Sequence, residues 1–141
     1  MLNKHHLNWL TISLLIACLL GCTAANHQRL LRKNVDRYNQ QLRWALMEDA
    51  QSFVDAEYLE NWRTSHLGGQ NNLKIVSIEP RLIKVTQTKP PAAFFKTRIV
   101  WYLEGNLRVQ ESLWEQEWKF HKSKWMLMSE KRLDGDSQKW P

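Results

Sequence analysis

Apolar residues recur at steps of three and four along the chain that follows residue 27. This spacing places them on one side of an α-helix, because a helix completes a turn every 3.6 residues. The pattern therefore predicts a long amphipathic helix at the start of the folded part of the chain. Its apolar stripe consists of Leu31, Val35, Tyr38, Leu42, Ala45 and Leu46.

Two shorter helical segments are predicted next. Residues 48–54 are typical of a single helical turn, and Asp55 is suited to cap a third helix with its side-chain oxygen. Gly68-Gly69 should end that helix, because glycine readily adopts the left-handed conformation found just after helices. The residues expected to face inward from the third helix are Tyr58, Leu59 and Trp62.

From residue 73 the apolar period falls to about two, which is the repeat of a β-strand. We predict strands over residues 73–85, 93–103, 107–120 and 125–130, with a hairpin turn at 104–106 and a second turn at 121–124. Pro80 indicates a bulge, an edge position or a break in the first strand. In the third strand the apolar residues switch parity, which predicts a bulge or burial on both faces. The two sets are Leu107, Val109, Leu113 and Trp114, Trp118, Phe120.

Helices followed by an antiparallel meander predict an α+β fold, with N-terminal helices packed on a curved, four-stranded, cone-like sheet. A pattern of residues accompanies this order of elements. It consists of Tyr38, Arg43-Trp44, Phe53-Val54, Trp118 and Lys124-Trp125. Over residues 28–132 this chain resembles the nuclear transport factor 2-like (SnoaL-like) proteins; a cystatin-like wrap with one helix is the alternative. The resemblance implies a pocket between helix and sheet, in a family that includes enzymes, binding modules and assembly modules. Residues 133–141 are expected to form a loose tail.

The N-terminal segment has the parts of a secretory signal: a basic Lys4, then an apolar run over residues 9–20 that is too short to span a membrane. It ends in Leu19-Leu20-Gly21-Cys22, which resembles the lipobox of bacterial lipoproteins. The resemblance implies removal of residues 1–21, cleavage between Gly21 and Cys22, acylation of Cys22, and a tether over residues 22–27. The alternative is that Cys22 is an ordinary apolar residue after a signal or a chance hydrophobic stretch.

Lipidation would make the membrane a partner of the chain through Cys22, because several acyl chains anchor a protein stably. Thr23 follows the cysteine, where an aspartate is the usual inner-membrane retention signal of Gram-negative lipoproteins. The expected location is therefore the outer membrane of a Gram-negative bacterium, facing the periplasm.

The chain carries 20 basic and 14 acidic residues, a net charge of +6. Nucleic acid is not an expected partner, because an exported chain rarely meets it. The two cysteines leave no disulfide or cysteine-rich metal site, because Cys18 departs with the signal and Cys22 is modified. We expect no metal and no cofactor.

Basic residues gather opposite the apolar stripe of the first helix. They are Arg29, Arg32, Lys33, Arg37 and Arg43, and the first four are the candidates for a membrane-facing surface. Two interpretations remain open. The basic face lies against anionic lipid near the anchor, where each cation contributes about 1 kcal/mol, or it is the solvated back of the helix.

Catalysis is not expected. The histidines after the signal, His27, His66 and His121, fall in a tether, a helix end and a turn, and no Ser-His-Asp order, metal-ligand spacing or phosphate loop is visible.

Two non-catalytic functions remain. The expected one is an interaction or assembly module of the envelope, which binds another envelope protein or a second copy of itself through an aromatic surface. The alternative is a pocket that binds a small apolar, aromatic or sugar ligand. The residues proposed for the pocket or interface are Tyr38, Trp101, Trp114 and Trp118.

Overall fold

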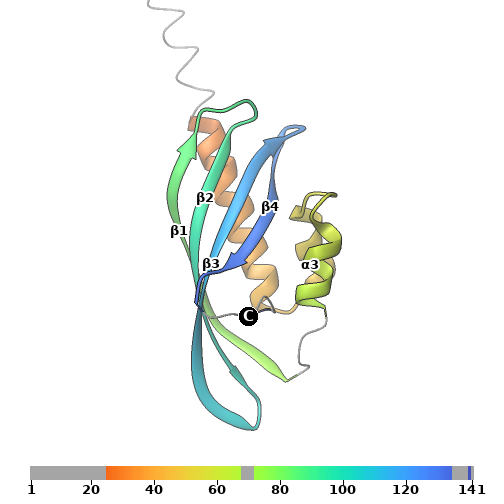
Figure 1. Cartoon of the computed structure of the whole chain (residues 1–141), viewed down its shortest axis with the longest axis vertical. Helices are drawn as coiled ribbons and strands as arrows, with labels where there is room; N and C mark the ends of the chain where they lie inside the picture. The colour runs from red at the N-terminus through yellow and green to blue at the C-terminus, as the bar shows by residue number, and fades with distance from the viewer. Residues whose placement is uncertain (1–24, 68–71, 135–139, 141) are drawn as a thin grey trace, which may run out of the picture.

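Helices come first and a four-stranded sheet follows in the computed structural model, which describes residues 25–67, 72–134 and 140 (Figure 1). The N-terminal helix is described over residues 25–43. It is followed by α2 (Met47–Ala50), the short 3-10 helix η1 (Gln51–Phe53) and α3 (Leu59–His66). The strands are β1 (Leu73–Thr86), β2 (Ala92–Leu103), β3 (Asn106–His121) and β4 (Lys124–Arg132). The predicted α+β fold is confirmed.

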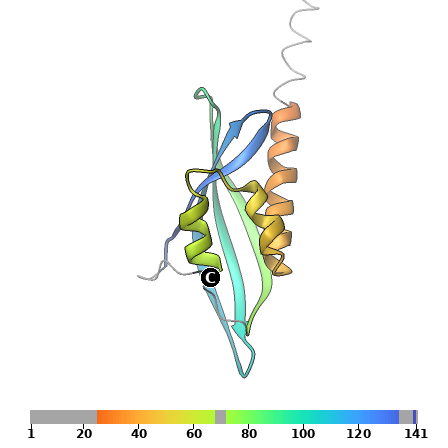
Figure 2. The ribbon, with the colours of Figure 1, turned by 90° about the vertical axis from the view of Figure 1, so that its right-hand side faces the viewer.

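The sheet is an antiparallel meander with the order β1-β2-β3-β4. Gly105 adopts a φ of +90° in the β2–β3 turn, a conformation that costs other residues steric strain. The β2–β3 hairpin extends past the C-terminal end of the N-terminal helix (Figure 2). The helix therefore covers only part of the length of the sheet.

Pro80 lies within β1, an edge strand, opposite Thr97 of β2. Register shifts flank it, one between Ile75 and Ser77 and one between Leu82 and Lys84. Bulges and proline both discourage pairing of an exposed edge with another strand. The edge and bulge expected from Pro80 are thus present.

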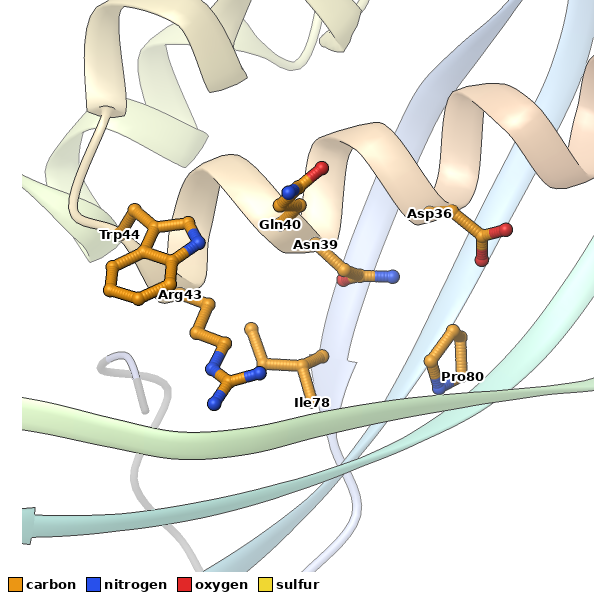
Figure 3. A pocket seen from close by; sticks show the side chains of 7 residues that line it. All are labelled: Asp36, Asn39, Gln40, Arg43, Trp44, Ile78 and Pro80. Atoms are coloured by element: carbon orange, nitrogen blue, oxygen red, sulfur yellow. The ribbon is translucent and has the colours of Figure 1, made fainter.

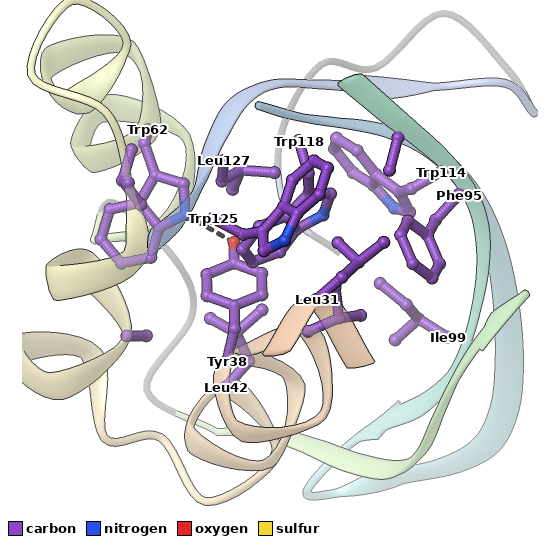
Figure 4. Close-up of a cluster of buried hydrophobic side chains, with 14 of the residues drawn as sticks. Leu31, Tyr38, Leu42, Trp62, Phe95, Ile99, Trp114, Trp118, Trp125 and Leu127 are labelled. Atoms are coloured by element: carbon purple, nitrogen blue, oxygen red, sulfur yellow. Dashed lines mark hydrogen bonds between the residues drawn. The ribbon is translucent and has the colours of Figure 1, made fainter. Parts of the chain in front are cut away.

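The core lies between the helices and the concave face of the sheet (Figure 4). The N-terminal helix contributes Leu31, Val35, Tyr38 and Leu42, each almost fully buried. The sheet and α3 supply four large indole rings, Trp62, Trp114, Trp118 and Trp125. Aromatic burial on this scale is a strong source of stability in a domain of this size.

The predicted apolar stripe is too long at its C-terminal end. Ala45 has a positive φ of 56°, which breaks the helical path, and Leu46 is exposed. Asp55 also differs from its predicted role, because its Oδ1 accepts a hydrogen bond from the Glu57 amide in the turn before α3 and does not cap the helix. Gly68 and Gly69 lie outside the described residues.

The irregularity predicted for β3 is present, because its pairing with β2 shifts register between Trp101 and Leu103. From Ser112 to Trp118 its buried residues keep one parity and are Ser112, Trp114, Gln116 and Trp118. Two of these are polar, and they conceal the alternation in the sequence. Val109 is exposed on the other face, where Arg98 forms ion pairs with Glu79 and Glu111. The expected aromatic outer surface on this strand is therefore a polar one.

Both ends of the predicted domain need correction. Residues 25–27 already belong to the N-terminal helix, so the predicted tether overlaps it. Trp140 is buried in the core cluster, so the predicted loose tail is wrong at that residue. Asp134 is also held, because its Oδ1 accepts a hydrogen bond from the Leu113 amide at 2.9 Å.

Candidate binding site

A pocket opens where the sheet extends beyond the N-terminal helix. Its volume is about 720 Å³, within the range of about 300–1,000 Å³ typical of small-ligand sites. We call it the helix-end pocket. It is lined by the C-terminal end of the helix, the start of β1, Tyr102 of β2, the end of α3 and Trp140.

The walls of the helix-end pocket are mostly apolar. Its apolar and aromatic lining residues are Leu42, Trp44, Ala45, Met47, Leu67, Leu73, Ile75, Val76, Tyr102 and Trp140. Several of them stay exposed, including Trp44 at 64% and Val76 at 44%. Exposed large apolar side chains gathered around a concavity indicate a contact surface, because water solvates such a patch poorly.

Two cations also line this pocket, Arg43 and Lys74. The Arg43 guanidinium lies over the Trp44 ring, 5.6 Å from its centroid. The Lys74 ammonium pairs with Glu104 at 3.4 Å, and both side chains are about half exposed. The pocket therefore combines apolar walls with positive charge, which suits an amphipathic anion.

His66 lies at the inner side of the pocket, stacked between two indoles. Its ring centroid is 4.4 Å from that of Trp62 and 4.6 Å from that of Trp140. The His66 Nε2 and the Glu130 Oε2 are 3.2 Å apart, and both side chains are fully buried. The two atoms are close enough for an ion pair but are not aligned as a hydrogen bond.

Glu130 is the centre of a buried polar network. Its Oε1 accepts hydrogen bonds from the Tyr38 hydroxyl at 3.0 Å and from the Gln116 amide at 2.7 Å. Trp62 donates to the Tyr38 oxygen at 2.8 Å, and Thr97 donates to the Gln116 carbonyl oxygen at 3.1 Å. These donors converge on Glu130, an arrangement that stabilises a carboxylate in a dry interior.

The two tyrosines beside Glu130 hold their protons firmly. Burial, with the charge of Glu130 adding to it, raises the pKa of the Tyr38 phenol well above its ordinary value. The same causes raise the pKa of Tyr58 to about 12. Both phenols therefore remain neutral at physiological pH, and Tyr38 acts as a donor in the network.

Neither ring nitrogen of His66 is available for proton transfer to a ligand. Nδ1 is 2.9 Å from the Trp62 carbonyl oxygen and 2.8 Å from the Ser65 hydroxyl oxygen. Nε2 faces Glu130. A general base needs a nitrogen within reach of its substrate. We therefore assign this pair a structural role, linking α3 to β4.

The predicted pocket or interface residues lie elsewhere. Tyr38, Trp114 and Trp118 are buried in the core, and Trp101 is half-buried. The described lining of the helix-end pocket contains none of the four. Tyr38, Trp114 and Trp118 are therefore not available for an exposed aromatic surface.

The structure describes only some of the other predicted site residues. Arg29, Arg32, Lys33 and Arg37 are all exposed on the N-terminal helix. Gly21 and Cys22 lie outside the described residues. Among the residues that the structure does describe, no three His, Cys, Asp or Glu side chains gather as a metal site would require.

The helix-end pocket was missed because its walls come from five separate segments of the chain. One signal in the sequence was available. After Arg43, the apolar residues Trp44 and Leu46 continue the stripe past the end of the helix, where the helix can no longer bury them.

The chain matches no protein-family model, no curated protein and no solved structure. The resemblance to nuclear transport factor 2-like proteins therefore stays a prediction. Within residues 25–67, 72–134 and 140, no helix has the length and apolar character needed to cross a membrane.

Proposed function

We propose that this chain is a lipid-anchored protein of the bacterial envelope that binds a small amphipathic ligand in the helix-end pocket. The ligand would have an apolar body and an anionic group. We propose no catalytic step, because His66, the histidine in the described pocket lining, has both ring nitrogens directed at protein groups.

The observation that carries this proposal is the pocket itself, with apolar walls, exposed aromatic rim and two cations. If the tryptophans served only to fill the core, they would leave no cavity of this size. An acyl or aromatic body would displace poorly solvated water from Ile75 and Val76, while Arg43 would attract the anionic group.

The position of the pocket is consistent with anchoring at Cys22. The helix described over residues 25–43 rises about 1.5 Å per residue, which is about 27 Å in all. The pocket lies at the C-terminal end of this helix, whereas Cys22 precedes its N-terminal end in the sequence. The site would thus be reached from the periplasm, with the exposed basic residues of the helix closer to the anchor.

Octanoate is a suitable probe because it is water-soluble, apolar in its body and anionic. We expect it to bind the processed protein in lipid nanodiscs, measured by calorimetry against empty nanodiscs. Val76→Glu should weaken binding about tenfold or more, equivalent to about 1.4 kcal/mol, because a carboxylate on the wall repels the ligand anion.

Val109→Glu is the matched control. Val109 is also an exposed strand valine, at 58%, but it does not line the pocket. Octylamine tests the sign of the charge and should bind more weakly than octanoate. The proposal fails if octanoate does not bind, or if the two valine variants weaken it equally.

Lipidation is tested separately. Cys22→Ala should leave a larger precursor that takes up no labelled palmitate, because the acylated thiol is missing. Cys18→Ala should be processed and labelled normally, since it lies inside the segment expected to be removed. Gel mobility and label incorporation measure both variants. Normal labelling of Cys22→Ala would contradict the anchor, and fractionation with the inner membrane would contradict outer-membrane sorting.

A further inference from the structure

A second cavity of about 380 Å³ lies between the N-terminal helix and β1 (Figure 3). We call it the polar groove. It adjoins the helix-end pocket, because Arg43 and Trp44 line both. The residues of the groove are Asp36, Asn39, Gln40, Arg43, Trp44, Ile78 and Pro80.

Asn39 is the unusual residue of this groove. Only 4% of it is exposed, and neither its Nδ2 nor its Oδ1 has a hydrogen-bond partner among the described residues. Asn34, on the same helix, donates from its Nδ2 to the Trp125 carbonyl oxygen at 3.2 Å. Buried amides in proteins are nearly always paired, so the Asn39 amide needs a partner from outside the described residues, such as a ligand that enters the groove.

The other polar groups show what chemistry that ligand needs. Figure 3 shows Asn39 between Asp36 and Arg43, with Trp44 at one end of the groove and Pro80 near the other. Asp36 accepts hydrogen bonds, Arg43 donates them, and the Asn39 amide does both. Asp36 lines this groove but not the helix-end pocket, so here the charges of Asp36 and Arg43 balance. That balance favours a neutral ligand that carries donors and acceptors side by side.

The exposed Trp44 ring adds a flat apolar platform to these groups. An anion would suit Arg43 but would be repelled by Asp36 and by the Asn39 carbonyl oxygen. A pair of neighbouring hydroxyl groups gives both polar atoms of Asn39 a partner: one hydroxyl accepts from Nδ2 while its neighbour donates to Oδ1.

We propose that the polar groove binds a saccharide, with two adjacent hydroxyl groups on the Asn39 amide and the C–H face of the ring against Trp44. This site is distinct from the helix-end pocket in chemistry, and it stands whether or not that pocket binds an amphipathic anion.

The test uses the processed full-length protein, labelled with ¹⁵N, in a detergent that has no sugar head group. The probe is the disaccharide of N-acetylglucosamine. We expect saturable shifts of the Asn39 side-chain amide and of the Trp44 indole N–H. Glycylglycine, which carries both charges, should produce no saturable shift at these groups, because the proposed ligand is neutral.

Asn39→Leu should weaken disaccharide binding at least tenfold, whereas Asn34→Leu should leave it within twofold of the wild type. Trp44→Ala changes an exposed residue, so it tests the same site without risk to the fold, and it should weaken binding at least threefold. Octanoate binding to Asn39→Leu should be unchanged, which separates this site from the helix-end pocket.

The saccharide proposal is overturned if the disaccharide shifts neither group up to its solubility limit. It is also overturned if Asn39→Leu and Trp44→Ala bind as tightly as the wild type, or if glycylglycine binds at the groove more tightly than the disaccharide.

Discussion

Glu130→Ala is expected to destabilise the domain by about 3–5 kcal/mol, because it leaves buried polar partners without an acceptor. Tyr38 and Gln116 both donate to the Glu130 Oε1, and the buried His66 faces its Oε2. Each of these groups was desolvated on folding and gains no replacement partner in the variant. Urea denaturation followed by tryptophan fluorescence measures the loss.

Two further glutamate variants test whether the loss of stability is specific to the buried network around Glu130. Glu130→Gln keeps an oxygen that can accept from Tyr38 and Gln116, so it should cost only about 1 kcal/mol. Glu79→Ala removes an exposed ion pair with Arg98 and should cost less than about 1 kcal/mol. Equal stability of the Ala and Gln variants at position 130 would show that the network contributes little.

Trp118→Ala is expected to cost about 3–5 kcal/mol, because it opens a cavity at the centre of the core. Trp118 is 0% exposed, and its ring packs edge-on against Tyr38 with centroids 5.5 Å apart. Trp44→Ala is the matched control: its ring is largely exposed, so the change should stay within about 0.5 kcal/mol. A tolerant Trp118→Ala would contradict the placement of this ring in the core.

The regular elements could be predicted from the sequence because their apolar residues repeat at the period of a helix or strand. The four expected strands match β1 to β4 closely. The prediction failed where polar residues take core positions. Gln116 and Ser112 point inward on β3, so the sequence alternation there misleads, and only the tertiary contact with Glu130 explains why Gln116 is buried.

The candidate site was less predictable, because no local pattern links its parts. Trp140 follows a polar segment whose composition predicts a loose tail, yet its ring stacks on His66 beside the pocket. Asn39 occupies an ordinary position on a helix. Only the placement of β1 opposite that helix shows that the Asn39 amide is buried and has no hydrogen-bond partner among the described residues. The sequence-based hypothesis placed Trp101, Trp114 and Trp118 in a pocket or an interface, whereas Trp114 and Trp118 are buried in the core.

These placements change which function is best supported. The expected assembly role depended on an exposed aromatic face that included Trp114 and Trp118, and both are buried. The two concavities at the end and along the side of the N-terminal helix favour ligand binding. The exposed rim around Trp44 and Val76 still offers an apolar surface, and its burial by a ligand would also reduce any tendency to self-associate.

The most direct test of ligand binding is a map of where octanoate contacts the protein. Methyl groups of the processed protein would be labelled with ¹³C and followed by NMR during the titration in nanodiscs. We predict that the saturable shifts fall on Leu73, Ile75, Val76 and Met47, which line the helix-end pocket. Saturable shifts centred on Val109 or Leu133, or none at the pocket, would contradict the proposed function.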